Sequence, residues 1–205
     1  MRMRSLAAVW FALSFVACSS VELPRERFWR LDVSSPAGGQ LPQGGVLRVA
    51  DLQLANALQG DCLLLTTGSA EMTPLERDRW IAPLDRLVTD AVVLGLSRSR
   101  MFALVKGAGD PGREDWSLHG RVVDFGIHQD REGRHGHVTF QFWVDQRDVL
   151  VLQDEFTARV PVADASAAAG VDALSSALQQ VLDQLTGRMR SARILDRSID
   201  SAPAK

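Results

Sequence analysis

Four histidines carry the side chains best suited to metal binding or acid–base chemistry, at positions 119, 128, 135 and 137. In a hairpin that turns at Glu132-Gly133, His128 faces His137 across the strands and His135 lies on their side. Asp130 would be close by, and imidazole with carboxylate is a ligand set that transition metals accept. We expect instead a polar, solvated hairpin tip, because no second shell of orienting residues is evident around this turn.

Other catalytic arrangements do not emerge from the residue pattern. No serine stands in a G-x-S-x-G sequence. The glycine-rich stretch "GAGDPG" (107–112) lacks the G-x-G-x-x-G spacing, and Pro111 has no N–H to offer a phosphate. The carboxylates of Asp85 and Asp90 fall along a helix flank, where solvated charge is the usual explanation. We therefore expect a protein that is not an enzyme.

Cys18 is the residue whose surroundings favour a covalent modification. Arg2 and Arg4 precede an uncharged run, Leu6–Ala17, which is shorter than the ~20 residues of a membrane-spanning helix and typical of a signal peptide. The run ends in "FVAC" (15–18), which is similar to the bacterial lipobox. We expect acylation of Cys18, with the lipid as the only attached group, and two or three acyl chains would anchor the protein stably. An ordinary cleaved signal is the alternative.

Charge and cysteine content narrow the remaining classes. Without Arg2 and Arg4 the chain has 21 basic and 25 acidic residues, a formal charge of about −4, so nothing favours nucleic acid. Cys62 has no partner once Cys18 is acylated, which excludes a disulfide framework and a multi-thiolate zinc site. We interpret Cys62 as a small apolar side chain of a strand.

Hydrophobic periodicity predicts an α+β fold. Alternation predicts strands in the first half at 27–35, 46–54, 62–67 and 101–105. Apolar residues three and four apart predict a helix after Pro74 that includes Trp80 and Leu94 and ends at Gly95. A second helix, within 164–189, carries a longer apolar stripe: Val171, Leu174, Leu178, Val181, Leu182, Leu185 and Met189. We expect both helices on one face of a mostly antiparallel sheet.

A β-hairpin and a following strand form the middle of this sheet. Val123, Phe125 and Ile127 alternate before the turn, and Val138, Phe140, Phe142 and Val144 alternate after it. The turn at Glu132-Gly133 would pair Phe125 with Phe140 on the core-facing side. The strand at 149–162 would add Phe156, Ala158 and Val160 to one side.

Trp143 falls on the opposite, polar side of this hairpin, between Gln141 and Asp145. Tryptophan is enriched among the few residues that dominate protein interfaces. We therefore regard Trp143 as the candidate anchor of an interface, with coverage by a loop as the alternative.

Several stretches together resemble the auxiliary lipoprotein components of ABC-type transport systems, the family of paraquat-inducible protein C. The most specific is "RWIAPLD" (79–85), with Arg79, Trp80, Pro83, Leu84 and Asp85, and "FWRLDVSSP", "FQFWV" and "DEFTARVPV" occur in the family order. We interpret the motif as mainly structural, because proline suits a first helical turn and Asp85 complements the helix dipole. The residue pattern predicts a signal peptide (1–17), a lipidated tether (18–27) and a flexible C-terminal tail (190–205), and the resemblance implies the family domain between them (28–189).

The resemblance implies a non-enzymatic component of an envelope lipid transport system. Such a protein would be anchored in the outer membrane, would face the periplasm, and would meet a substrate-binding protein of the mammalian-cell-entry (MCE) type and its inner-membrane permease. Self-association stays open. Two alternatives remain: an outer-membrane assembly factor of the lipopolysaccharide-translocon type, and a periplasmic metal-binding module that uses His128, His135 and His137.

Overall fold

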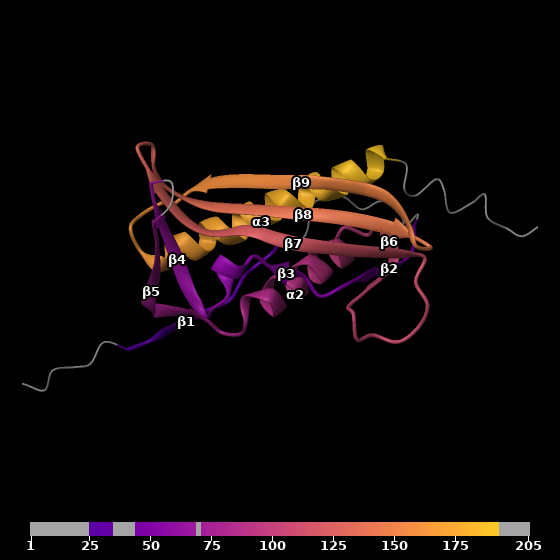
Figure 1. Ribbon diagram of the computed structural model, residues 1–205, viewed down its shortest axis with the longest axis horizontal. Helices are drawn as coiled ribbons and strands as arrows, with labels where there is room; N and C mark the ends of the chain where they lie inside the picture. Colours follow the sequence, from indigo (N-terminus) through magenta and orange to yellow (C-terminus); the bar gives the residue numbers. More distant parts are fainter. Residues whose placement is uncertain (1–24, 35–43, 69–70, 193–205) are drawn as a thin grey trace, which may run out of the picture.

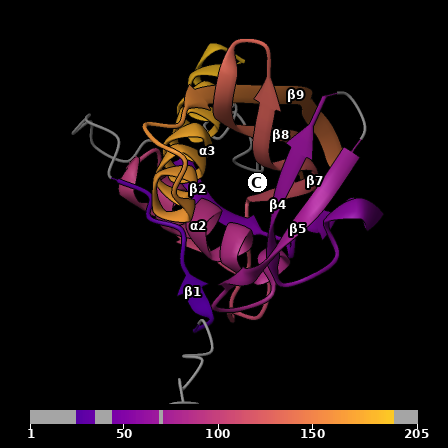
Figure 2. The ribbon, with the colours of Figure 1, turned by 90° about the vertical axis from the view of Figure 1, so that its left-hand side faces the viewer.

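The computed structural model describes residues 25–34, 44–68 and 71–192. Cys18, the signal peptide, most of the tether and tail residues 193–205 lie outside the described residues. The described residues form one nine-stranded sheet and two long helices, which lie side by side on one face of the sheet (Figures 1 and 2). The strands are β1 (Arg27–Trp29), β2 (Gly44–Val49), β3 (Gln53–Leu54), β4 (Cys62–Thr67), β5 (Glu71–Trp80), β6 (Phe102–Lys106), β7 (Trp116–Asp130), β8 (Gly133–Gln146) and β9 (Val149–Pro161). The helices are α2 (Leu84–Arg98), α3 (Ala167–Ser191) and the short 3-10 helix η2 (Asn56–Leu58).

The α+β class is confirmed, but the prediction of a mostly antiparallel sheet is wrong. Antiparallel pairs join β4 to β5, β7 to β8 and β8 to β9. Parallel pairs join β1 to β5 and β2 to β6, and β2, β3 and β4 each pair in parallel with the same long strand, β7. Residue alternation shows which face a side chain takes but carries no information on strand direction.

The first long helix begins later than predicted. Residues 74–80 belong to β5, and α2 starts only at Leu84, after Pro83 at its N-cap. The three- and four-residue spacing therefore ran across a bend at residues 81–82. Gly95 does not end α2. A Cβ at this position would lie 2.5 Å from Leu182 Cδ1 in α3, so the glycine lets α3 pack closely against α2. Leu94, predicted on the apolar face, is 43% exposed.

The hairpin faces were predicted correctly, whereas the pairing was not. Phe125 pairs with Val138 and not with Phe140, because the turn is centred one residue earlier, between Asp130 and Gly133. A shift of two in pairing leaves every side chain on its face. The exception is Val123, which falls at a β-bulge between Val122 and Asp124 and is exposed, so that Val122 takes its place in the core.

The core lies between the sheet and the helices. Phenylalanines from three strands form its centre, with ring centroids 6.4 Å apart for Phe125 and Phe140, and 6.0 Å for Phe142 and Phe156. The predicted stripe of α3 is confirmed, since all seven of its residues are buried. Ser166 caps α3 by accepting a hydrogen bond from the N–H of Ala169. Among the described residues, neither long helix has the length and apolarity that a bilayer crossing requires.

Candidate functional site

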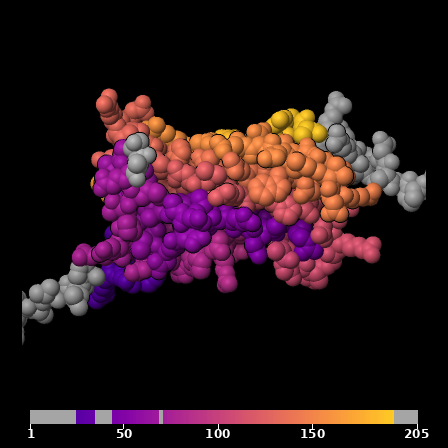
Figure 3. Space-filling model, viewed as in Figure 1, coloured from indigo at the N-terminus to yellow at the C-terminus, as the bar shows by residue number. Residues whose placement is uncertain are grey.

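The sheet face away from α2 and α3 carries polar side chains along β7, β8 and β9, and we call this part of the sheet the open face. Neither helix covers it, as the space-filling view shows (Figure 3). Alternation along β8 places its apolar residues in the core and the intervening ones on the open face. The β8 residues on the open face are His135, His137, Thr139, Gln141, Trp143 and Asp145.

Trp143 lies on the open face, as predicted from alternation. Its ring stacks on the imidazole of His119 in β7, with centroids 6.1 Å apart and an angle of 9° between the planes. His119 Nε2 is 3.5 Å from a carboxylate oxygen of Asp145. Trp143 is half-buried, so part of a large flat aromatic surface remains in contact with solvent, held by a stacked partner.

Cross-strand hydrogen bonds fix the polar side chains beside Trp143. Gln141 Nε2 donates to Glu155 Oε2 over 3.0 Å, and the hydroxyls of Thr139 and Thr157 are 3.0 Å apart. Gln141 and Glu155 are exposed. A surface whose side chains are already ordered loses less conformational entropy when it binds a partner.

Three histidines gather at the tip end of the open face, but in a pairing different from the one predicted. His128 pairs with His135, and His137 pairs with Gly126. The ring centroids are 4.7 Å apart for His128 and His137, and 5.7 Å for His128 and His135. Asp124 faces this group, with its carboxylate 3.1 Å from His128 Nε2 and 3.8 Å from His137 Nε2.

The prediction of a solvated tip is wrong for His135, which is only 5% exposed. Burial lowers the pKa of His135 and of His137, and the positive charge of Arg159 lowers both further. Neutral imidazole can bind a metal. In the part of the chain that the structure describes, however, no three His, Cys, Asp or Glu side chains are placed to hold one. Asp124 occupies the position toward which two of the rings point.

Arg79 and Trp80 of the "RWIAPLD" motif connect short strands. Arg79 Nη1 donates to both carboxylate oxygens of Asp61, at 2.8 and 2.7 Å, and its Nε donates to Glu26. Trp80 is 4% exposed, and its ring meets that of Phe125 edge-on. Both side chains thus act within the fold.

The remaining motif residues begin α2. The carbonyl of Pro83 accepts hydrogen bonds from the N–H groups of Arg86 and Leu87. Leu84 is buried, and Asp85 lies in the first helical turn, where a negative charge complements the helix dipole. The hydroxyl of Thr89 donates to the carbonyl of Asp85 and accepts a hydrogen bond from the N–H of Leu52. This bond joins α2 to the segment between β2 and β3.

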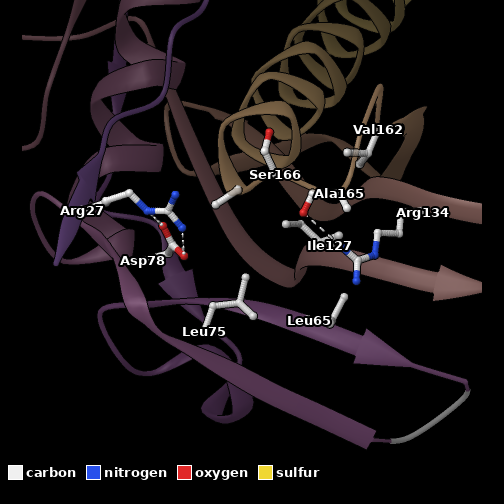
Figure 4. Close-up of a pocket in the computed structure, with 10 residues that line it drawn as sticks. Arg27, Leu65, Leu75, Asp78, Ile127, Arg134, Val162, Ala165 and Ser166 are labelled. Atoms are coloured by element: carbon white, nitrogen blue, oxygen red, sulfur yellow. Dashed lines mark hydrogen bonds and ion pairs between the residues drawn. The ribbon is translucent and has the colours of Figure 1, made fainter. Parts of the chain in front are cut away.

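A cavity of about 210 Å³ lies where the first turn of α3 meets β5 and the tip of the hairpin (Figure 4). Its charged groups are engaged with one another or with the backbone. Arg27 is paired with Asp78 over 2.8 Å, and Arg134 donates to Gln129 and to the carbonyl of Ala165. Ser166, the one hydroxyl in its lining, caps α3. These contacts join three elements and supply no nucleophile with an adjacent base.

The loop at 107–115 is organised by a charge cluster that the sequence did not suggest. Arg48 Nε is 2.8 Å from Glu114, whose other oxygen is 3.2 Å from Nζ of the buried Lys106. Hydrogen bonding from Arg48 lowers the pKa of Glu114 to about 2.

Cys62 is a half-buried free thiol of β4, and burial raises its pKa.

Comparison with protein families gives one match, to the ABC-type transport auxiliary lipoprotein component, over residues 30–186. No curated protein matches the sequence. The interval includes the "RWIAPLD" motif and all of β7, β8 and β9.

Solved structures with the same fold share little sequence with this chain. A DUF330-family protein from Xanthomonas campestris is 19% identical, with a TM-score of 0.74, and the alignment covers 84% of this chain and 99% of that one. An uncharacterized protein is 16% identical, with a TM-score of 0.66 and coverage of 81% and 99%. At these identities the similarity shows a common fold and no more.

Proposed function

Because the chain belongs to the family of ABC-type transport auxiliary lipoprotein components, we propose that it is a non-enzymatic accessory component of an MCE-type envelope lipid transport system. It would be anchored in the outer membrane by acylated Cys18 and would face the periplasm. The family match over residues 30–186 carries this proposal. The lipobox-like "FVAC" at residues 15–18 adds the anchor.

An accessory component without catalytic groups acts through contact, and the open face offers the surface for it. An interface of standard size buries ~800 Å² on each partner. The face presents half-buried Trp143 stacked on His119, with exposed Gln141 and Glu155 joined beside it. A central aromatic with an ordered polar rim is the usual composition of an interface centre. We place the MCE-type substrate-binding protein here, with a second copy of this chain as the alternative occupant.

Fractionation and copurification test the two parts of this proposal separately. Wild-type protein should take up labelled fatty acid, fractionate with the outer membrane and copurify with an MCE protein. Cys18→Ser should remain soluble or unprocessed and take up no label. A wild-type protein without label would contradict the anchor. Copurification with an outer-membrane barrel instead of an MCE protein would favour a lipopolysaccharide-translocon role.

A further inference from the structure

Two large apolar side chains project into solvent at the end of the molecule where the described chain begins. Phe28 in β1 is 58% exposed and Ile81, just after β5, is 64% exposed. Pro83, two residues after Ile81, is exposed as well. We call Phe28, Ile81 and Pro83 the tether-end patch. β1 and β5 lie at one end of the elongated domain, and the turn between β8 and β9 lies at the other (Figure 1).

Strand pairing brings Phe28 and Ile81 to the same end of the sheet. Phe28 pairs with Arg79 in the parallel β1–β5 ladder, and the N–H of Ile81 donates to the carbonyl of Trp29 over 2.8 Å. The indole of Trp29 points toward Asp78, to which its Nε1 donates a hydrogen bond. Because side chains alternate along a strand, Phe28 points to the opposite side. The patch is therefore built on a paired backbone, which holds it in place.

Two arginines without an acidic partner in the described chain lie close in sequence to the patch. Residues 25–30 contain Arg25, Arg27 and Arg30 against one acid, Glu26, and Glu26 is already paired with Arg79. Arg25 and Arg30 are exposed and have no acidic partner among the residues that the structure describes. Arg27 remains more than half exposed in spite of its ion pair with Asp78. Exposed apolar side chains next to these unpaired arginines match the boundary of an anionic bilayer, where acyl chains meet phosphate.

The length of chain before the patch limits its distance from the proposed anchor. Six residues, 19–24, separate acylated Cys18 from Arg25, the first described residue. At ~3.3–3.6 Å per residue, Arg25 lies within about 25 Å of Cys18 even if the chain is fully extended. Phe28 follows three residues later. If Cys18 is acylated, the bilayer that holds the acyl chains therefore lies within reach of the patch.

We propose that the tether-end patch rests on the bilayer, with Phe28 and Ile81 inserted between headgroups and Arg25 and Arg30 on lipid phosphates. This rests on the proposed anchoring at Cys18, and it adds a second, non-covalent membrane contact. Such contact would orient the domain, with the β8–β9 turn directed away from the membrane and the open face standing to the side. The occupant of the patch is then a phospholipid surface and not a protein.

Depth-dependent fluorescence quenching tests this contact. In a Cys62→Ser background, Phe28→Cys, Ile81→Cys and Val149→Cys are each labelled with an environment-sensitive dye. Val149, in the β8–β9 turn region, is the matched control because it is apolar and 63% exposed at the other end. The proteins are placed on vesicles of phosphatidylethanolamine and phosphatidylglycerol that carry nitroxide-labelled lipid. One preparation is acylated and a second is held by an N-terminal histidine tag on a nickel-chelating lipid.

Quenching and a blue shift are expected at positions 28 and 81 and not at 149, and quenching should weaken when phosphatidylcholine replaces phosphatidylglycerol. Equal quenching at 28 and 149 would overturn the proposal, and so would a blue shift at 28 without quenching, which would indicate a protein on the patch. Flotation of the acylated preparation is read first. Its failure would contradict the anchor, while the tag-held preparation would still report on the patch.

Discussion

Trp80 at the end of β5 packs edge-on against Phe125 in the middle of β7, with ring centroids 5.9 Å apart and planes at 66°. This contact joins the short strands at the tether end to the central hairpin. The backbone of Trp80 also pairs with that of Trp29 in the β1–β5 ladder, and the backbone N–H of Trp80 donates to the carbonyl of Asp61. One buried side chain thus connects the beginning of the domain to its core.

Trp80→Ala should lower the free energy of unfolding by ~3–5 kcal/mol, because it removes a buried indole and leaves a cavity beside Phe125. That is a large share of the ~5–15 kcal/mol typical of a domain. Urea unfolding measures the change. Trp80→Phe, which keeps an aromatic ring there, should cost clearly less. An unchanged midpoint in the alanine variant would contradict the structural interpretation of the motif.

Gly136→Ala should destabilise the domain by about 1–3 kcal/mol, because there is no room for a methyl group under α3. A Cβ at this β8 position would lie 2.7 Å from the carbonyl carbon of Ala173 and 2.8 Å from the nitrogen of Leu174. Both are helix backbone atoms, so α3 would have to move. The control is Gly109→Ala, in a loop with nothing within 4 Å of the added carbon. Equal melting temperatures for the two variants would refute this packing.

The histidines of the open face should make the protein less stable in mild acid. Burial lowers the pKa of His135 and His137 below the ordinary 6.5, so the unfolded chain binds protons first as the pH falls. Stability should be full above about pH 6.5 and should decrease as the pH falls toward the folded-state pKa values. His137→Asn should flatten this decrease in urea titrations at several pH values, with little change above about pH 7.5. An equally steep decrease in the variant would argue against the burial effect.

Glu114 should make the stability of the protein depend on pH in a more acidic range than the histidines do. The hydrogen bond from Arg48 lowers its pKa from 4.5 to about 2, so its contribution is present above pH 4.5 and is lost as the pH falls toward about 2. Glu114→Gln should remove this part of the acid dependence and should loosen the loop at 107–115. Glu76→Gln, at an exposed carboxylate of β5, controls for the change in net charge. Matching acid-unfolding curves for the Glu114 variant and wild type would count against the cluster.

Strict periodicity explains what could be predicted from the sequence. The stripe of α3 repeats over many turns, and the hairpin phenylalanines alternate on both sides of a marked turn, so their faces were correct. β5 was missed because it buries few side chains, although it forms a hairpin with β4, and because Trp80 and Leu84 happen to have helical spacing. Parallel pairing along β7 depends on tertiary packing, which local pattern does not reveal.

The candidate site shows the same division between local and tertiary information. Alternation alone placed Trp143 on the polar face. Its stacking partner depends on the register, and the predicted turn would have put His119 opposite Gln146. The earlier turn and the bulge at Val123 together bring His119 opposite Trp143. The burial of His135 likewise comes from neighbours on other strands, so residue type did not indicate it.

The affinity of the Trp143→Ala variant for the proposed MCE-type partner tests the central claim most directly. Trp143 lies on the open face and outside the phenylalanine core, so its truncation should weaken association about tenfold or more, as for interface hot spots, while the melting temperature changes little. Leu94→Ala, at an exposed residue on α2, is the control and should bind as wild type does. Unchanged binding by Trp143→Ala together with a large loss of stability would contradict the account.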